Sequence, residues 1–276
     1  MTLTPAQLDA YFARIGIAPP ARADLEGLAA IHRAHALAFT WEAADAFLLR
    51  PGAGDVDPRR AFARMVEGRR GGWCYEMNGL LGAALAGFGF RVTRLCGGVR
   101  RAEMGEMAVG NHLSLRVDLA DGPWLVESGL GDALPRPIPL AVGAHEGGFL
   151  ACAIETADGD WLRYVNHRWG QASSFDFRAD YSDEARLAGM EAFLRTQPGS
   201  PFTGALAVMR HFPDRIESLA NRTRRTVTAV GVETREITDA ADFAETLGGL
   251  FALDLPDVPV LWAKTGEAAA RGKQAA

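Results

Sequence analysis

The first ninety residues place apolar side chains at the three- and four-residue steps of amphipathic helices. The first such segment begins with a capping box formed by Thr4 and Gln7, has Pro5 at its first helical position, and ends at Gly16. Two more segments follow, at about residues 25–38 and from Asp57-Pro58 to Gly68. Three capped segments of this kind predict a small helical bundle.

A fourth helical segment begins near Tyr75. Its apolar positions recur at the same steps and are Met77, Leu80, Leu81, Ala84, Leu85 and Phe88. Counting back three residues from Met77 reaches Cys74, so we expect this thiol at the N-terminus of the helix and on its inward face. Gly71 and Gly72 precede it in the stretch "RRGGWCYEMN".

After about residue 90 the apolar spacing changes to two, which is typical of strands. The clearest segments are "RVTRLCGGV", "HLSLRVDLADGPWLVES", "FLACAIET" and "WLRYVNHRW". We therefore expect mostly antiparallel strand from about 90 to 180. Further on, "RRTVTAVGV" and "TREI" predict strands, a helix is expected from about Asp239, and the final "EAAARGKQAA" is expected to fray. The class is α+β.

The composition is that of an ordinary globular protein, with 48% hydrophobic and 23% charged residues among 276. The net charge of −5 argues against binding to nucleic acid, because the field repels phosphates. The longest apolar run, "GLLGAALAGFGF", is too short for a membrane span, and no signal peptide is visible. Three irregularly spaced cysteines do not form a disulfide framework, so we expect a cytoplasmic protein with reduced thiols.

Cys74 is the candidate nucleophile. A thiol reacts only after it loses its proton, and the free N–H groups and partial positive charge of a helix start favour the thiolate. Gly71 and Gly72 leave the approach open and allow backbone amides to reach a bound carbonyl, which suits acyl transfer. Position alone gives equal weight to the alternative that Cys74 is a small buried apolar residue.

A histidine and a carboxylate follow in the chain. His112 begins the strand "HLSLRVDL" on the face opposite its apolar residues, and Glu127 ends the next strand after three apolar residues. In this order Cys74, His112 and Glu127 would be nucleophile, base and orienting group. A simple hairpin around Asp121-Gly122 places Glu127 opposite about Arg116, so a bend is needed to reach His112. Asp118, on the same face as His112, is the alternative orienting group.

These elements resemble the arylamine N-acetyltransferase family. The stretch "RGGWCYEMN" matches that family's R-G-G-x-C-x-E-x-N signature in full, and "NHLSL" and "WLVESGLG" follow at the expected places. Weaker likenesses are "YFARIG", "HALAFTWEAADAF" and "TLGGLFAL". The resemblance covers almost the whole chain.

The resemblance implies a papain-like layout of three parts: a helical bundle over 1–89, a β-barrel-like domain over 90–190, and a connecting helix with an α/β lid over 191–276. It also implies a triad of Cys74, His112 and Glu127. The implied reaction passes an acetyl group from acetyl-CoA to arylamines, arylhydrazines or N-hydroxyarylamines in two half-reactions, without a metal. The implied partners are coenzyme A and small aromatic amines or hydrazines, with no nucleic acid and no membrane.

Glu127 departs from the family, which has aspartate in a D-V-G-F-G-like run at this place. One extra methylene adds roughly 1.3–1.5 Å of reach, and a misplacement of that order costs about a hundredfold in rate. Our hypothesis is that the triad forms but is less well aligned. Two alternatives follow: a cysteine hydrolase or amide synthase on the same layout, and a weakly active protein that binds CoA or arylamines.

Other candidate residues are better explained by packing. His32 and His35 have a spacing that metal ligands use, but no further ligand completes a shell, so we expect them in the core. Cys96 and Cys152 lie in apolar strands. We expect packing also for Trp73, Tyr75 and Phe39, which are the candidates for a wall around the thiol, and a structural tie for Arg69 and Glu76. Two further pairs are weak candidates for contacts with CoA: the turn-like glycines Gly97-Gly98 and the arginines Arg100-Arg101.

Overall fold

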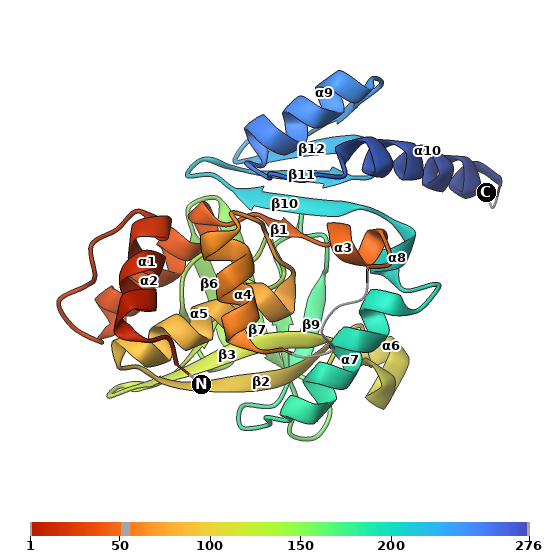
Figure 1. Cartoon of the computed structure of the whole chain (residues 1–276). Helices are drawn as coiled ribbons and strands as arrows, with labels where there is room; N and C mark the ends of the chain where they lie inside the picture. Colours follow the sequence, from red (N-terminus) through yellow and green to blue (C-terminus); the bar gives the residue numbers. More distant parts are fainter. Residues whose placement is uncertain (1, 51–55, 275–276) are drawn as a thin grey trace.

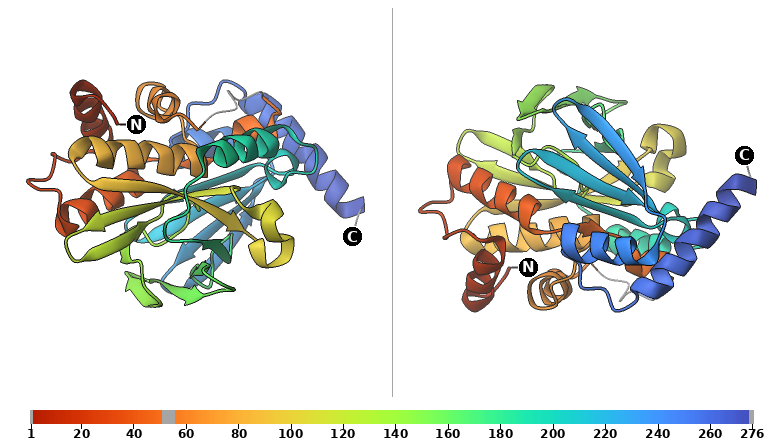
Figure 2. Two further views of the ribbon diagram at one scale, coloured as in Figure 1. Left: turned by 90° about the horizontal axis from the view of Figure 1, so that it is seen from below. Right: turned by 90° about the horizontal axis from the view of Figure 1, so that it is seen from above.

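The computed structural model describes residues 2–50 and 56–274. N-terminal helices pack beside an eight-stranded barrel-like sheet, and a second sheet of five strands carries the C-terminal helices (Figure 1). Figure 2 shows the same layers from below and above. The α+β class is therefore confirmed, whereas the domain limits at 89 and 190 stay predictions. Within the described residues, no helix combines the length and apolarity needed to cross a membrane.

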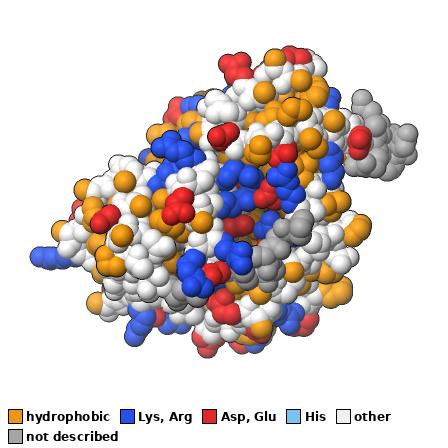
Figure 3. All heavy atoms as spheres, in the orientation of Figure 1, with side chains coloured by type: hydrophobic (Ala, Val, Ile, Leu, Met, Phe, Trp, Pro, Cys, Tyr) orange, Lys and Arg blue, Asp and Glu red, His pale blue; other side chains and the backbone are white. Residues whose placement is uncertain are grey.

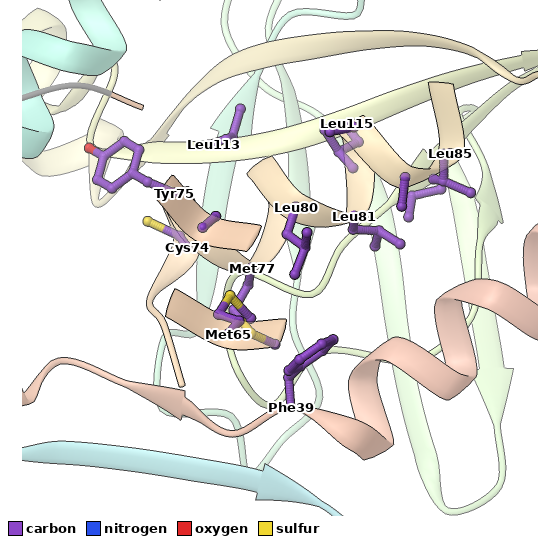
Figure 4. Packing of buried hydrophobic residues seen from close by; sticks show 14 of the residues in the cluster. Phe39, Met65, Cys74, Tyr75, Met77, Leu80, Leu81, Leu85, Leu113 and Leu115 are labelled. Carbon is purple, nitrogen blue, oxygen red and sulfur yellow. The ribbon is translucent and has the colours of Figure 1, made fainter. Parts of the chain in front are cut away.

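The predicted N-terminal helices are present. Their bounds are α1 Pro5–Ile15, α2 Leu25–Ala38, α3 Ala44–Phe47, α4 Pro58–Phe62 with a π-helical continuation Ala63–Glu67, and α5 Cys74–Phe88. The expected capping box of Thr4 and Gln7 forms, and Gly16 ends α1 in the left-handed conformation. Helix α5 lies in the core: Met77, Leu80 and Leu81 are almost fully buried (Figure 4).

The large sheet has the strand order β5-β4-β3-β2-β9-β8-β7-β6, and each neighbouring pair is antiparallel. The bounds are β2 Arg91–Val99, β3 His112–Leu119, β4 Gly122–Val126, β5 Ile138–Pro139, β6 Gly143–Gly147, β7 Leu150–Thr156, β8 Leu162–Val165 and β9 Ser174–Phe177. Gly97 pairs with His112 of β3, and Gly98 pairs with Asp176 of β9. The prediction of a turn at these glycines was wrong, because they lie where one strand changes partner.

The second sheet has the order β1-β10-β11-β12-β13. Its strands are β1 Trp41–Glu42, β10 Ala207–His211, β11 Arg215–Ala220, β12 Thr223–Thr228 and β13 Gly231–Glu236. The remaining helices are α6 Arg101–Met104, the 3₁₀ turn Gly105–Ala108, α7 Glu184–Thr196, α8 Pro201–Gly204, α9 Ala240–Glu245 with a π-helical continuation Thr246–Leu250, and α10 Val258–Gln274. The prediction of a frayed C-terminus was wrong for residues 267–274, because this alanine-rich segment has high helix propensity and continues α10 to Gln274, whereas residues 275–276 lie outside the described residues.

A buried charge network holds the segment that precedes α5. The side chain of Glu42 has no exposed surface, and its carboxylate binds both Arg64 and Arg70. The same two guanidinium groups bind Asp45. These ion pairs connect strand β1 to the π-helical segment and to the turn that precedes α5.

Arg69 and Glu76, expected to form a structural tie, do not bind each other. Glu76 accepts a hydrogen bond from the backbone N–H of Trp73 at 3.1 Å and binds Arg195 of α7 at 3.2 Å. Its carboxylate therefore caps α5 and joins the start of this helix to α7.

We predict that Glu42→Gln lowers the free energy of unfolding by about 1.5–3 kcal/mol, because it removes the fully buried one of the two carboxylates that Arg64 and Arg70 share. Urea denaturation followed by circular dichroism measures this change. The matched control is Glu103→Gln, which removes an ion pair with Arg100 whose side chains are 61% and 66% exposed. That variant should change stability by less than about 1 kcal/mol, and equal losses in both variants would contradict the prediction.

Candidate active site

Cys74 is the first residue of α5, and only 4% of its surface is exposed. Figure 4 shows it at the end of the helix beside Tyr75, apart from the row of Leu80, Leu81 and Leu85. Its sulfur lies 3.9 Å from the backbone oxygen of Asn111, the residue that precedes His112. The start of α5 thus places the thiol beside the start of β3, where His112 is the first residue.

Burial raises the pKa of the Cys74 thiol far above its ordinary value, and the carboxylates of Glu76 and Glu127 add to this effect. Backbone hydrogen bonds at Leu113 and Tyr75 oppose it but are weaker. The expectation that the helix start favours the thiolate was therefore incomplete. Burial therefore favours the thiol form of Cys74, and a neighbouring base is needed to favour the thiolate.

The imidazole of His112 meets the carboxylate of Glu127. His112 Nε2 lies 3.0 Å from Glu127 Oε2, and the two residues are 2% and 4% exposed. The ring of Phe175 lies beside the imidazole, with centroids 4.5 Å apart. Because Nε2 faces the carboxylate, Nδ1 is the ring nitrogen left to accept a proton. His112 and Glu127 therefore lie together as the sequence predicted.

The strand register explains how Glu127 reaches His112. Leu119 pairs with Gly122 and Leu115 with Val126, so the hairpin turns one residue earlier than expected, which shifts each pairing partner by two residues. Glu127 follows the last paired residue and stands two positions nearer to His112 than the predicted place opposite Arg116. The chain then turns, which supplies the bend that the sequence did not show.

Glu127 is surrounded by hydrogen-bond donors. Its Oε1 accepts the backbone N–H groups of Gly129 at 2.5 Å and of Leu130 at 2.8 Å. Asn78 Nδ2 lies 3.3 and 3.4 Å from the two carboxylate oxygens. The extra methylene of glutamate allows one oxygen to bind this turn while the other reaches His112. This geometry argues against the hypothesis that glutamate aligns the imidazole poorly.

Asn78, one turn after the thiol, joins the elements of the site. Its Nδ2 donates to Leu113 O at 2.6 Å, and its Oδ1 accepts the N–H of Ser128 at 2.9 Å. The backbone oxygen of Glu127 also lies 3.1 Å from His32 Nε2. Burial lowers the pKa of His32 to about 4, so at pH 7 the ring is neutral and Nε2 donates to this oxygen. His32 was expected in the core, and this support of Glu127 was not foreseen.

The glycines around Cys74 permit close backbone contacts. A Cβ on Gly71 would lie 2.2 Å from Thr40 O, and one on Gly72 would lie 2.6 Å from Glu76 Cβ. On Gly129 it would lie 2.9 Å from Cys74 Cβ. Glycine is therefore required at positions 71 and 72 by close contact with β1 and α5, and not only by access to the thiol.

Most of the other candidates pack as expected. Trp73, Tyr75 and Phe39 are at most 2% exposed, and Cys96 and Cys152 are buried in strands. His35 lies 3.0 Å from the hydroxyl of Tyr11. Within the part of the chain that the structure describes, no group of histidines, cysteines and carboxylates is arranged to hold a metal ion.

Asp118 is not the partner of His112. Arg91 and Arg116 bind its carboxylate at 3.1 and 2.8 Å. The two arginines suggested for CoA are also engaged: Arg101 binds Asp176 and Asp158, and Arg100 binds Glu103.

Comparisons with known proteins identify the family. The family model described as N-acetyltransferase matches residues 24–259. The arylamine N-acetyltransferase of Mycolicibacterium smegmatis is 33% identical over 259 residues, which cover 91% of this chain and 93% of the relative. The chain belongs to the arylamine N-acetyltransferase family. Members so named are acyltransferases, so this chain is an enzyme of that class.

Solved structures of the family share the fold. The structure of Mycobacterium marinum arylamine N-acetyltransferase in complex with CoA has a TM-score of 0.84 at 27% identity, covering 95% of this chain and 99% of that chain. The enzyme of Nocardia farcinica has a TM-score of 0.80 at 31% identity, covering 94% and 93%. The family resemblance drawn from the sequence is therefore confirmed.

We predict that Glu127→Asp slows alkylation of Cys74 by iodoacetamide at pH 7 by roughly ten- to a hundredfold. The shorter carboxylate cannot bind the 129–130 turn and His112 at once, and such a misplacement costs this much. Peptide mapping by mass spectrometry follows the modification of Cys74 separately from that of the other two cysteines. Asp118→Asn, which removes the rejected partner, should leave the rate unchanged. Faster alkylation of Glu127→Asp would instead show that aspartate aligns the site better.

The raised thiol pKa gives a second prediction. In His112→Gln no base removes the proton from Cys74, so we expect alkylation at pH 7 to fall by about 10²–10⁴-fold. Because the thiolate fraction of a thiol grows tenfold per pH unit below its pKa, the rate in this variant should rise steadily with pH. The native chain should instead show a plateau at neutral pH. Identical pH profiles in both proteins would exclude His112 as the base.

Proposed function

We propose that this enzyme transfers the acetyl group of acetyl-CoA to arylamines, arylhydrazines or N-hydroxyarylamines through an acetyl-cysteine at Cys74. His112 is the general base and acid, and Glu127 orients it. The observation that carries the proposal is the 3.0 Å contact of His112 Nε2 with Glu127 Oε2 beside a buried thiol at a helix start. The CoA bound in the related Mycobacterium marinum structure supports the choice of donor.

In the first half-reaction His112 takes the proton of Cys74, and the sulfur attacks the carbonyl carbon of acetyl-CoA. The bond from that carbon to the CoA sulfur breaks, and the imidazolium returns the proton to the leaving thiolate. One thioester replaces another, so the step is nearly balanced in free energy. The buried carboxylate of Glu127 stabilises the imidazolium while it exists.

In the second half-reaction an amine nitrogen attacks the acetyl carbon on Cys74. The bond from this carbon to the Cys74 sulfur breaks, His112 removes a proton from the nitrogen, and the thiol is restored. An amide replaces a thioester, which is downhill. The apolar surroundings of Cys74 disfavour water as the acceptor, because burial of this kind excludes solvent from the acyl group. This favours transfer over the alternative of a hydrolase.

The proposal predicts an acetyl adduct. After brief exposure to acetyl-CoA, intact-protein mass spectrometry of the native chain should show the mass of one acetyl group. An arylamine should then remove it, and Cys74→Ser should not acquire it. Glu127→Gln should acetylate more slowly, because the neutral amide does not stabilise the imidazolium.

Other outcomes distinguish the alternatives. Spontaneous loss of the adduct in water, without an amine, would identify a hydrolase. Acylation by a carrier-protein thioester, followed by ring closure of a tethered amine, would identify an amide synthase. CoA binding with no adduct in the native chain would indicate a binding protein without catalysis and would contradict the proposal.

A further inference from the structure

The peptide unit between Glu127 and Ser128 is held from both sides. Its carbonyl oxygen lies 3.1 Å from His32 Nε2 of α2, and its N–H donates to Asn78 Oδ1 of α5 at 2.9 Å. The C=O and N–H of a trans peptide point in opposite directions, so two such contacts fix the orientation of the peptide plane. Two helices that are separate in the sequence therefore determine how the chain leaves Glu127.

Strand pairing does not set the orientation of this peptide. Val126 pairs with Leu115 and is the last residue of β4 to pair with β3, and on the side of β5 the pairing ends at Leu125. The carbonyl of Glu127 thus lies beyond the ladder of the large sheet, and its hydrogen-bond partner is a side chain of the helical layer. His32 supplies the hydrogen bond that the sheet no longer provides.

Rotation of this peptide would displace the hydrogen-bond donors of the Glu127 carboxylate. The N–H groups of Gly129 and Leu130, which donate to Oε1, follow directly after it. With these donors displaced, one carboxylate oxygen could not bind the turn while the other contacts His112 at 3.0 Å. The carbonyl that His32 holds is therefore linked through the turn to the direction in which the carboxylate points.

Packing alone does not explain a histidine at position 32. Charged side chains lie at the surface in the middle of the drawn face, where water solvates them (Figure 3), but the imidazole of His32 is fully buried. Burial lowers its pKa to about 4, so at pH 7 the ring is neutral and Nε2 donates. Its Nδ1 is buried without a hydrogen-bond partner among the described residues, which costs free energy that an apolar side chain would avoid. The hydrogen bond to Glu127 is the contact that accounts for the ring.

His35, one turn further along α2, has different partners. Its imidazole is also fully buried, but its Nδ1 lies 3.0 Å from the hydroxyl of Tyr11 on α1. Its ring packs beside Phe39, with centroids 4.8 Å apart. The same residue type thus occurs twice in one helix, equally buried, with hydrogen-bond partners in different parts of the fold.

We propose that His32 is a positioning residue of the active site. By holding the carbonyl of Glu127 it fixes the turn after β4, and this turn directs the carboxylate to His112. The inference rests on the proposed function, in which Glu127 orients the base His112. Helix α2 therefore contributes to the reactivity of Cys74 although it carries none of the three residues of the triad.

Alkylation of Cys74 by iodoacetamide, followed by peptide mapping, tests this role in the whole chain. We expect His32→Met to lower the rate at pH 7 by about five- to tenfold, the change that the loss of one ordinary hydrogen bond produces. His32→Gln places an amide N–H near the position of Nε2 and should restore most of the rate. His35→Met is the matched control, because it also removes a buried imidazole from α2, and it should alkylate as the native chain does. Urea denaturation of the same variants measures stability separately from alignment.

A native rate in His32→Met, or equal slowing in His35→Met or in His32→Gln, would overturn the inference. If His32→Met does not fold, His32→Asn takes its place with the same expected slowing, because its shorter amide does not reach the carbonyl. Failure of the proposed function has a different signature, since His112→Gln would then alkylate at the native rate. A slow His112→Gln variant together with a native rate in His32→Met would contradict the role of His32 alone.

Discussion

The candidate active site depends on the buried carboxylate of Glu127. A charge removed from water is tolerated only when hydrogen bonds or an opposite charge replace its hydration. Here the replacements are two backbone N–H groups of the turn after β4, the amide of Asn78 and the ring of His112. These donors belong to three local structures, so the carboxylate determines how that turn, α5 and β3 meet. The length of the Glu127 side chain matters for the same reason, because glutamate can bind the turn with one carboxylate oxygen and the imidazole with the other.

Burial of the thiol has a consequence for mechanism. Burial and the carboxylates of Glu76 and Glu127 raise the pKa of the Cys74 thiol, and backbone hydrogen bonds at Leu113 and Tyr75 oppose this. The thiolate is therefore favoured only opposite a cation, for which the imidazolium of His112 is the candidate. The same burial that disfavours the thiolate would also keep water from an acyl group on the sulfur. Protection of the thiol and preference for an amine acceptor thus have one physical origin.

Local signals in the sequence predicted local structure well. The caps of α1 and α2 and the alternation of β2 act between near neighbours, so their bounds were readable. The strand register that brings Glu127 to His112 could not be read from the sequence, because it depends on where a two-residue turn falls between β3 and β4. Strands β10 and β11 were missed since their mixed polar sequences, "AVMRH" and "RIESLA", lack a clear alternation. The signature and the segments after it identified the family and predicted three candidate site residues, but they carried no information on the donors around Glu127.

Trp41 links the second sheet to the candidate active site. Its backbone joins the turn before α5 to β10, and its indole Nε1 donates to Gly129 O at 2.6 Å, within the Glu127 turn. One residue of β1 thus contacts both β10 and the turn that supports the imidazole. The fold therefore offers a short physical connection between the second sheet and the alignment of His112.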